Sequence, residues 1–136
     1  MNEAAASFIE LAKEDLAVAR RVLKDYPRPA AFHLQQAAEK LLKAVLSAEG
    51  ITFTAGHQLG ELAGLLPNDH NWRADLMAFD EYTPYATSTR YPKPGGGMPH
   101  PPPTDKLDKS LKEVVSLVDE IRDWCEERDK KSKWGR

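Results

Sequence analysis

One polar face of a predicted helix carries side chains that could contact a nucleotide. Four polar residues are spaced by three, four and three positions: His33, Gln36, Lys40 and Lys43. This spacing places them on one side of a helix. Lysine offers a point charge to phosphate, and the Gln36 amide is both donor and acceptor toward a base edge. The same pattern also fits a solvated helix face, a helix-packing face or a dimer interface.

Arg90 and Tyr91 form the second candidate. A guanidinium is a planar fork suited to phosphate, and a neighbouring phenol ring can stack on a base. Tyr82 and Tyr85 lie close by in sequence, and a segment rich in proline and glycine follows. The alternative is that Tyr82 and Tyr85 belong to the core and that Arg90 pairs with an acid.

The sequence contains no motif for a phosphate-binding loop, a helical metal site or a disulfide. The glycines at positions 95–97 are not followed by the Gly-Lys-Ser/Thr of a phosphate loop. The four histidines lack the spacings of a helical metal site. Cys125 is the only cysteine, which excludes an internal disulfide and any Cys-x-x-Cys motif. The sequence therefore predicts no metal and no cofactor.

Three long stretches with helical periodicity must position these residues. Their apolar stripes run through residues 9–23, 34–48 and 107–125. Alanines in the first two stretches would let their backbones approach closely, as in an antiparallel helix pair. Pro27 and Pro29 mark the turn between them, so we expect the second helix from about Ala30, with Gly50 at its C-terminal cap.

The apolar spacing and the prolines in the middle of the chain predict a broken helix. A short helix ends at Pro67, a further helix follows a cap at Asn68 or Asp69, and Pro84 interrupts it. Nine of the thirteen residues 92–104 are proline or glycine, which indicates a mobile loop. The predicted fold is all-α, an up-and-down four-helix bundle with a broken third helix, or five helices. One domain covers residues 1–128, and a basic tail that frays covers residues 129–136.

Length, composition and charge fit this single domain. The chain has 136 residues, of which 41% are hydrophobic and 29% charged, typical of a folded globular protein. A net charge of −2 gives no basic footprint over the whole molecule for nucleic acid or anionic membrane. No apolar run reaches the roughly 18 residues of a membrane span, and the N-terminus lacks the basic region of a signal peptide. We expect a cytoplasmic protein that does not contact membranes.

The run Phe32-His33-Leu34-Gln35-Gln36-Ala37-Ala38-Glu39-Lys40-Leu41-Leu42-Lys43-Ala44 resembles the signature helix of HEPN domains. Supporting marks follow the family order along the chain: Lys13-Glu14-Asp15-Leu16 before the signature, His57-x-Leu59 after it, and Tyr85-x4-Arg90-Tyr91-Pro92 before the last helix. The resemblance covers about Phe8 to Cys125. It implies a helical bundle of four or five helices, often a homodimer, and often encoded beside a small nucleotidyltransferase in toxin–antitoxin-like pairs.

Some branches of that family are ribonucleases with an Arg-x4–6-His motif at the dimer interface, and this chain departs from that pattern. Nine residues separate Arg90 from His100. Arg28-x4-His33 has the right spacing but lies in the first turns of the signature helix, so we interpret it as coincidence. The departure speaks against ribonuclease activity.

The leading hypothesis is a non-catalytic HEPN module that binds a nucleotide or RNA and a nucleotidyltransferase partner. Its candidate site residues are Arg90, Tyr91, Lys40, Lys43, Gln36 and His33. One alternative is a metal-independent endoribonuclease toxin, which would use Arg90 with His100 or His57, or Arg28 with His33. Another is a purely structural dimerisation or adaptor bundle. Asp15, at the edge of an apolar stripe, is expected to pair with Lys40 or Arg90, and His57 to order its loop or contact a ligand.

Overall fold

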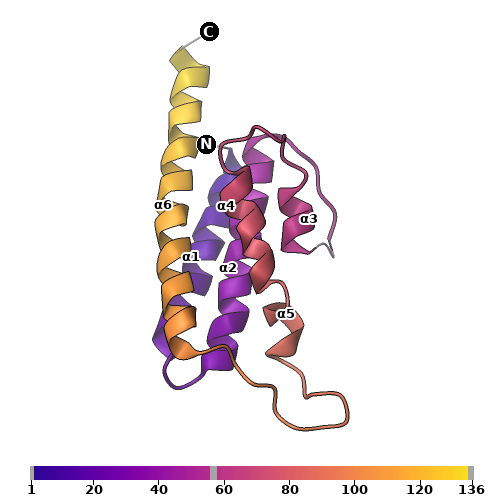
Figure 1. Cartoon of the computed structure of the whole chain (residues 1–136). Coiled ribbons are helices and arrows are strands. Elements are labelled where there is room, and N and C mark those ends of the chain that lie inside the picture. The colour runs from indigo at the N-terminus through magenta and orange to yellow at the C-terminus, as the bar shows by residue number, and fades with distance from the viewer. Residues whose placement is uncertain (1, 56–57, 135–136) are drawn as a thin grey trace.

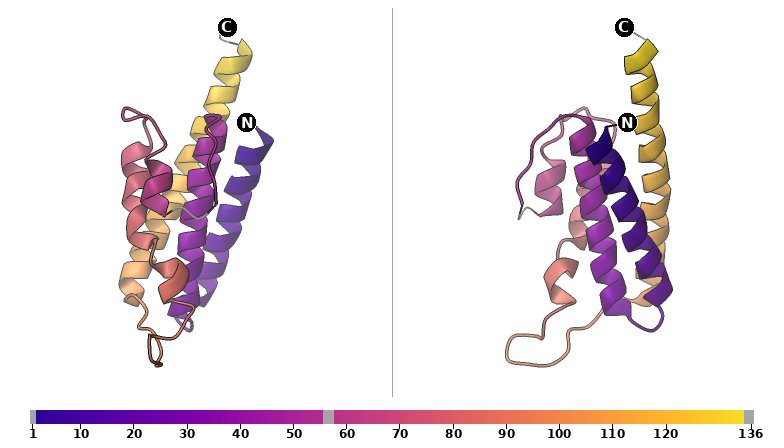
Figure 2. Two further views of the ribbon diagram at one scale, coloured as in Figure 1. Left: turned by 90° about the vertical axis from the view of Figure 1, so that its right-hand side faces the viewer. Right: turned by 180° about the vertical axis from the view of Figure 1, so that it is seen from behind.

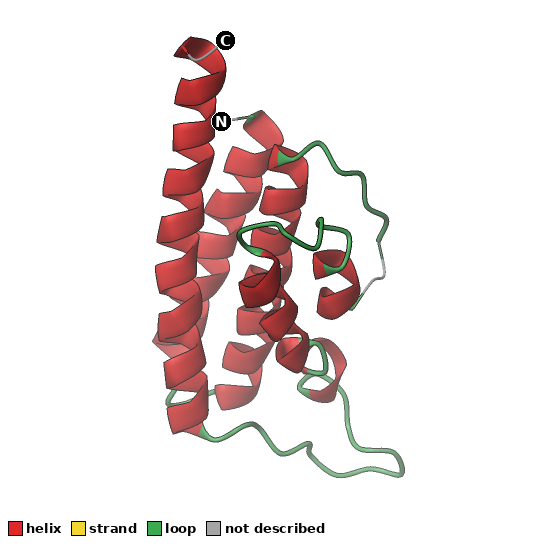
Figure 3. Ribbon diagram, turned by 45° about the horizontal axis from the view of Figure 1, so that its top comes forward, coloured by secondary structure: helices red, strands yellow, loops and turns green. Residues whose placement is uncertain are grey.

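The chain is all-helical across the residues that a computed structural model describes, which are 2–55 and 58–134. Three long helices frame the molecule: α1 (Glu3–Val22), α2 (Pro27–Ala48) and α6 (Thr104–Trp134). Four short segments lie between α2 and α6: α3 (Leu59–Ala63), α4 (Arg73–Met77), the 3₁₀ helix η1 (Ala78–Tyr82) and α5 (Tyr85–Ser88). Helices and connecting loops account for every described segment (Figure 3). The predicted all-α bundle is confirmed.

Two long helices, α1 and α2, form an antiparallel pair (Figure 2). The Asn2 side-chain amide donates to the Ser47 carbonyl oxygen at 2.9 Å, which shows how the two helices are aligned. In that alignment three alanines of α1 stand opposite three alanines of α2, each set spaced by seven residues. All six are fully buried: Ala5, Ala12 and Ala19, opposite Ala44, Ala37 and Ala30. Small side chains along both helices allow the close approach that the sequence predicts.

The two ends of α2 illustrate how local sequence sets helix boundaries. The helix begins at Pro27, three residues before the predicted start, because proline is well tolerated in a first turn, where its missing N–H is not needed. At the other end Gly50 has a left-handed φ of 69°, and the Ile51 N–H donates to the Leu46 carbonyl oxygen at 2.9 Å. This is the glycine-terminated helix end that the sequence predicts.

The third helix is broken, as predicted, but its pieces differ from the expected ones. α4 and η1 form one descending segment that runs antiparallel to α2 and α6 (Figure 1). The helix starts at Arg73 rather than after a cap at Asn68 or Asp69, and no side-chain cap closes its N-terminus. Leu76, Phe79 and Tyr82 turn inward and are buried, so even this irregular segment contributes to the core.

The last long helix, α6, closes the bundle and continues past it (Figure 1). Its buried stripe is the predicted one: Leu107, Leu111, Val114, Val118, Ile121 and Cys125. Burial raises the pKa of the Cys125 thiol above its ordinary value, which disfavours the reactive thiolate. The helix reaches Trp134 and so runs through most of the segment predicted to be a basic tail. None of the helices in the described ranges has an apolar stretch that would fit a lipid bilayer.

The proline- and glycine-rich loop before α6 returns past the start of α2. Three successive glycines, Gly95, Gly96 and Gly97, have positive φ angles of 84°, 107° and 95°, which other residues adopt only with strain. The loop is tied to the bundle by Arg28, whose guanidinium donates to the Pro99 carbonyl oxygen at 3.2 Å.

Candidate functional site

The outer face of α2 is a half-buried polar strip between α1 on one side and α5 with its following residues on the other. All four predicted residues of this strip are partly buried: His33, Gln36, Lys40 and Lys43. The helical spacing predicted from sequence therefore places them on one face. Their partners, of which sequence spacing indicates only Glu39 for Lys43, decide what each can bind.

Asp15 of α1 organises one edge of the strip. One carboxylate oxygen lies 2.8 Å from His33 Nδ1, and the other accepts from Lys40 Nζ at 2.5 Å. Asp15 is only 8% exposed, and a buried carboxylate needs such partners to offset its lost hydration. Pairing of Asp15 with Lys40, one of the two predicted partners, is thus found. Asp15 holds the imidazole in place and neutralises the Lys40 charge.

Lys43 and Gln36 also have neighbours within the protein. Lys43 Nζ lies 3.3 Å from a Glu39 carboxylate oxygen and 5.7 Å from the centre of the Phe53 ring. The Gln36 amide nitrogen donates to the side-chain oxygen of the buried Gln35 at 2.7 Å. The two lysines of the strip are therefore both paired with acids. The strip is close to electrically balanced.

Arg90 lies at the opposite edge of α2 and has a different environment. Its guanidinium carbon is 4.5 Å from the centre of the Phe32 ring and 5.3 Å from that of Tyr91, and its Nε donates to the Ala86 carbonyl oxygen at 2.7 Å. Among the described residues no acid pairs with Arg90. Tyr91 is 57% exposed. The structure thus presents a charged, planar group, held by two aromatic rings, at the molecular surface.

Phe32 connects the two edges of the candidate site. Its ring meets that of His33 edge-on, with 5.4 Å between their centres, and its contact with Arg90 is on the side of α5. Sequence reasoning did not select Phe32. An aromatic residue beside the polar strip was the available indication in the sequence. Its partner, Arg90, lies 58 positions away in the chain, and their contact arises only because α5 packs against α2.

Tyr82 and Tyr85 fit the core interpretation better than a ligand-stacking role. Their rings stack on one another with 6.1 Å between centres, and Tyr82 is 4% exposed. Burial raises the pKa of both phenols. Of the three tyrosines near Arg90 in sequence, Tyr91 is the most exposed.

A separate polar cluster stabilises the far end of α2. Glu49 accepts from His70 Nε2 at 2.7 Å and from Arg128 at 2.5 Å, while His70 Nδ1 accepts the Trp72 backbone N–H at 3.1 Å. Both ring nitrogens of His70 are thereby used, with the proton on Nε2. This network joins α2, the turn before α4 and α6, so its role is structural.

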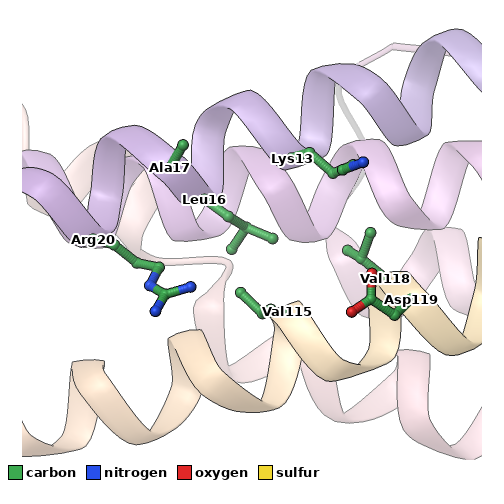
Figure 4. A pocket seen from close by; sticks show the side chains of 7 residues that line it. All are labelled: Lys13, Leu16, Ala17, Arg20, Val115, Val118 and Asp119. Carbon is green, nitrogen blue, oxygen red and sulfur yellow. The ribbon is translucent and has the colours of Figure 1, made fainter.

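The apolar hollow between α1 and α6 contains none of the predicted site residues (Figure 4). It measures about 170 Å³ and arises where the short side chains of Ala17, Val115 and Val118 leave a gap. Lys13 and Arg20 of α1 and Asp119 of α6 stand around it (Figure 4). Among the described residues no group of three or more His, Cys, Asp or Glu side chains could hold a metal ion.

Comparison with known proteins identifies the fold built around this surface. The HEPN domain family matches the chain over residues 5–128. This chain belongs to the HEPN family. It is 28% identical over 133 residues to the protein named Putative toxin MJ1304 of Methanocaldococcus jannaschii, covering 89% of this chain and 88% of that protein. The crystal structure of ST0689, an archaeal HEPN homologue, superposes with a TM-score of 0.67 and 25% identity, covering 92% of this chain and 99% of the other.

In this structure the two side chains of the Arg28-x4-His33 spacing do not contact the same group. Five residues along a helix correspond to a rotation of roughly 140°, so the two side chains leave α2 in different directions. Arg28 points to the loop at Pro99, whereas His33 points to Asp15. His100 is exposed in the proline-rich loop. His57, the other candidate, lies outside the described residues.

Proposed function

We propose that this chain is a toxin-like HEPN module that binds a nucleotide or RNA on the surface between Asp15 and Tyr91. The observation that supports this most is the Arg90 guanidinium, which contacts both the Phe32 ring and the Tyr91 ring and has no acidic partner among the described residues. The name of the Methanocaldococcus relative supports the toxin-like part of the proposal.

The charges of the surface favour Arg90 over the two lysines as the phosphate contact. Lys40 and Lys43 each already neutralise a carboxylate, so an incoming phosphate would compete with Asp15 or Glu39 for them. Arg90 offers its unused N–H groups without such competition, and a guanidinium can bind two phosphate oxygens at once. The lysines would then add only secondary, longer-range attraction.

An exposed aromatic ring supports Tyr91 as the contact for the base of the ligand. Tyr91 is exposed beside the Arg90 guanidinium, and a base stacked on such a ring contributes roughly 1–3 kcal/mol. Gln36 and His33 lie along the same face of α2 and offer hydrogen-bonding groups to a base or ribose. A nucleotide with its phosphate at Arg90 and its base on Tyr91 satisfies both features.

Replacing Arg90 with alanine is expected to weaken nucleotide or RNA binding by about 10- to 100-fold, because charge-assisted hydrogen bonds to phosphate are lost. The measurement is a thermal-shift and fluorescence-polarisation series with ATP, GTP, their diphosphates and a short labelled RNA. A ligand at 100 times its Kd stabilises the fold by about 2.7 kcal/mol.

The matched control is Arg122→Ala, which removes the same side chain from α6, where Arg122 pairs with Asp119 at 3.5 Å. It should leave affinity unchanged. Binding that Arg90→Ala does not weaken, in a variant that still unfolds cooperatively, would show that the phosphate contact lies elsewhere. If none of these ligands shifts the wild-type transition, the adaptor interpretation replaces the proposal.

The Asp15–His33 pair favours ribonuclease activity as a second candidate function. With His33 Nδ1 beside the carboxylate, Nε2 has no hydrogen-bond partner among the described residues and is free to exchange a proton with a ribose hydroxyl or a leaving oxygen. If the pair is catalytic, purified protein cleaves labelled RNA in the presence of EDTA, and His33→Ala slows cleavage by at least about 100-fold. Intact RNA after prolonged incubation would refute this candidate.

Pairing with a nucleotidyltransferase remains a prediction from the family resemblance. Co-expression of the chain with a nucleotidyltransferase encoded beside it, followed by co-purification, tests that prediction directly.

A further inference from the structure

The hollow between α1 and α6 combines an apolar interior with charged ends. It measures about 170 Å³. The most deeply buried of its lining residues are Leu16 and Val118, which are 3% and 2% exposed, and Val115 continues the apolar lining. Water in such a hollow finds few hydrogen-bond partners, so an apolar group that displaces this water gains free energy. The interior is therefore suited to a short aliphatic chain.

The two ends of the hollow differ in charge. Arg20 lies at one end, with its side chain extending from α1 toward α6, and Lys13 and Asp119 lie at the other (Figure 4). Asp119 is 3.5 Å from Arg122, and Lys13 is 3.7 Å from Glu10. Within the described residues Arg20 has no ion-pair partner. One end of the hollow thus presents an uncompensated positive charge, whereas the charges at the other end are balanced.

We propose that this hollow binds an aliphatic monocarboxylate of medium chain length, with its carboxylate at Arg20 and its chain over Leu16 and Val118. A guanidinium can donate two parallel hydrogen bonds to a carboxylate. One negative charge matches the one unpaired guanidinium, and Asp119 disfavours a second anionic group at the far end. The proposal goes beyond nucleotide or RNA binding and does not depend on it, because no residue of that candidate site lines the hollow.

The length of the hollow limits the length of the chain. Arg20 and Lys13 are seven residues apart on α1, which corresponds to about 10 Å along the helix axis. An extended chain of about eight carbons has the same length, because a C–C bond measures ~1.5 Å. The additional carbons of a longer chain would meet Lys13 and Asp119 and stay in water. Charged groups at both ends also favour a small molecule over a partner helix, which needs a groove that continues past the contact.

Isothermal titration calorimetry of the full chain with octanoate tests the proposal. Octanoate should bind at least about tenfold more tightly than butyrate, because four more methylene groups leave water for the hollow. Decanoate should gain less than about twofold over octanoate, because its last carbons find no room. Octylammonium has the same chain and the opposite charge, so Arg20 repels it and it should bind at least about tenfold more weakly than octanoate.

Two variants locate the bound octanoate. Ala17→Leu fills the hollow from α1 and should weaken binding at least about tenfold. Arg20→Gln removes the charged contact to the carboxylate and should weaken binding about tenfold. The matched controls are Ala4→Leu and Arg21→Gln, which make the same changes at α1 positions that do not line the hollow and should leave the affinity unchanged. All four positions are exposed, so the variants are expected to fold, and circular dichroism checks this.

Three results would overturn the proposal. Octanoate that binds no more tightly than butyrate would show that the hollow does not take up the chain. Equal affinities for octanoate and octylammonium would show that the hollow recognises an apolar group alone, as it would for a side chain of a partner protein. Octanoate affinity that is unchanged in both Ala17→Leu and Arg20→Gln would place the bound molecule elsewhere on the chain.

Discussion

Replacing Ala37 with leucine is expected to lower the free energy of unfolding by about 3 kcal/mol. Ala37 is fully buried at the middle of α2, opposite Ala12 in the alignment that the Asn2–Ser47 hydrogen bond shows. Adding three carbon atoms between two closely packed backbones requires the helices to separate or side chains to leave their preferred rotamers. The cost is high because the neighbouring alanine pairs on either side hold the helices together.

Thermal or urea unfolding followed by circular dichroism measures this loss, which corresponds to a decrease in Tm of roughly 10 °C. Ala4→Leu is the matched control: it makes the same change at an exposed position of α1 and should alter stability by less than about 0.5 kcal/mol. If Ala37→Leu is as stable as wild type, α1 and α2 are not closely packed around Ala37 and Ala12.

The fold was largely predictable because its determinants are local and periodic. The three long helices follow from apolar stripes, and the close α1–α2 contact follows from buried alanines at a spacing of seven. Helix boundaries were less predictable where two local rules compete. Proline ends helices in general but is accepted in a first turn, and this exception moves the start of α2 to Pro27.

The candidate site was predictable only along α2. Periodicity places His33, Gln36, Lys40 and Lys43 on one face, yet it cannot show which charges are neutralised. Only the pairing of Lys43 with Glu39 follows from sequence distance, as an i, i+4 contact. Asp15 had two predicted partners, and packing decides between them: Lys40 lies at the α1 edge of α2, whereas Arg90 is held at the other edge against Phe32.

Replacing Asp15 with alanine is expected to destabilise the fold by about 2 kcal/mol. The carboxylate joins α1 to two side chains of α2, and its removal leaves the Lys40 ammonium, one-quarter exposed, without its counter-charge. A partly exposed cation is destabilised less by the loss of its counter-charge than a fully buried one, because water still reaches it. Lys40→Met should cost less than Asp15→Ala, since Asp15 keeps its contact with His33 and the methionine stem retains the packing of the lysine stem.

A double-mutant cycle separates this pair from the rest of the surface. If the ion pair is the main contact of both residues, the stability losses of the two single variants are not additive. The double variant Asp15→Ala/Lys40→Met should then lose about 1 kcal/mol less than the sum of the two single losses. Urea unfolding of the four proteins measures this coupling, and Lys43→Met with Asp15→Ala, which share no contact, should give none. A coupling near zero would mean that Lys40 is held by the helix rather than by Asp15. In that case Lys40 would be free to bind phosphate, and the assignment of the phosphate contact to Arg90 alone would have to be extended to it.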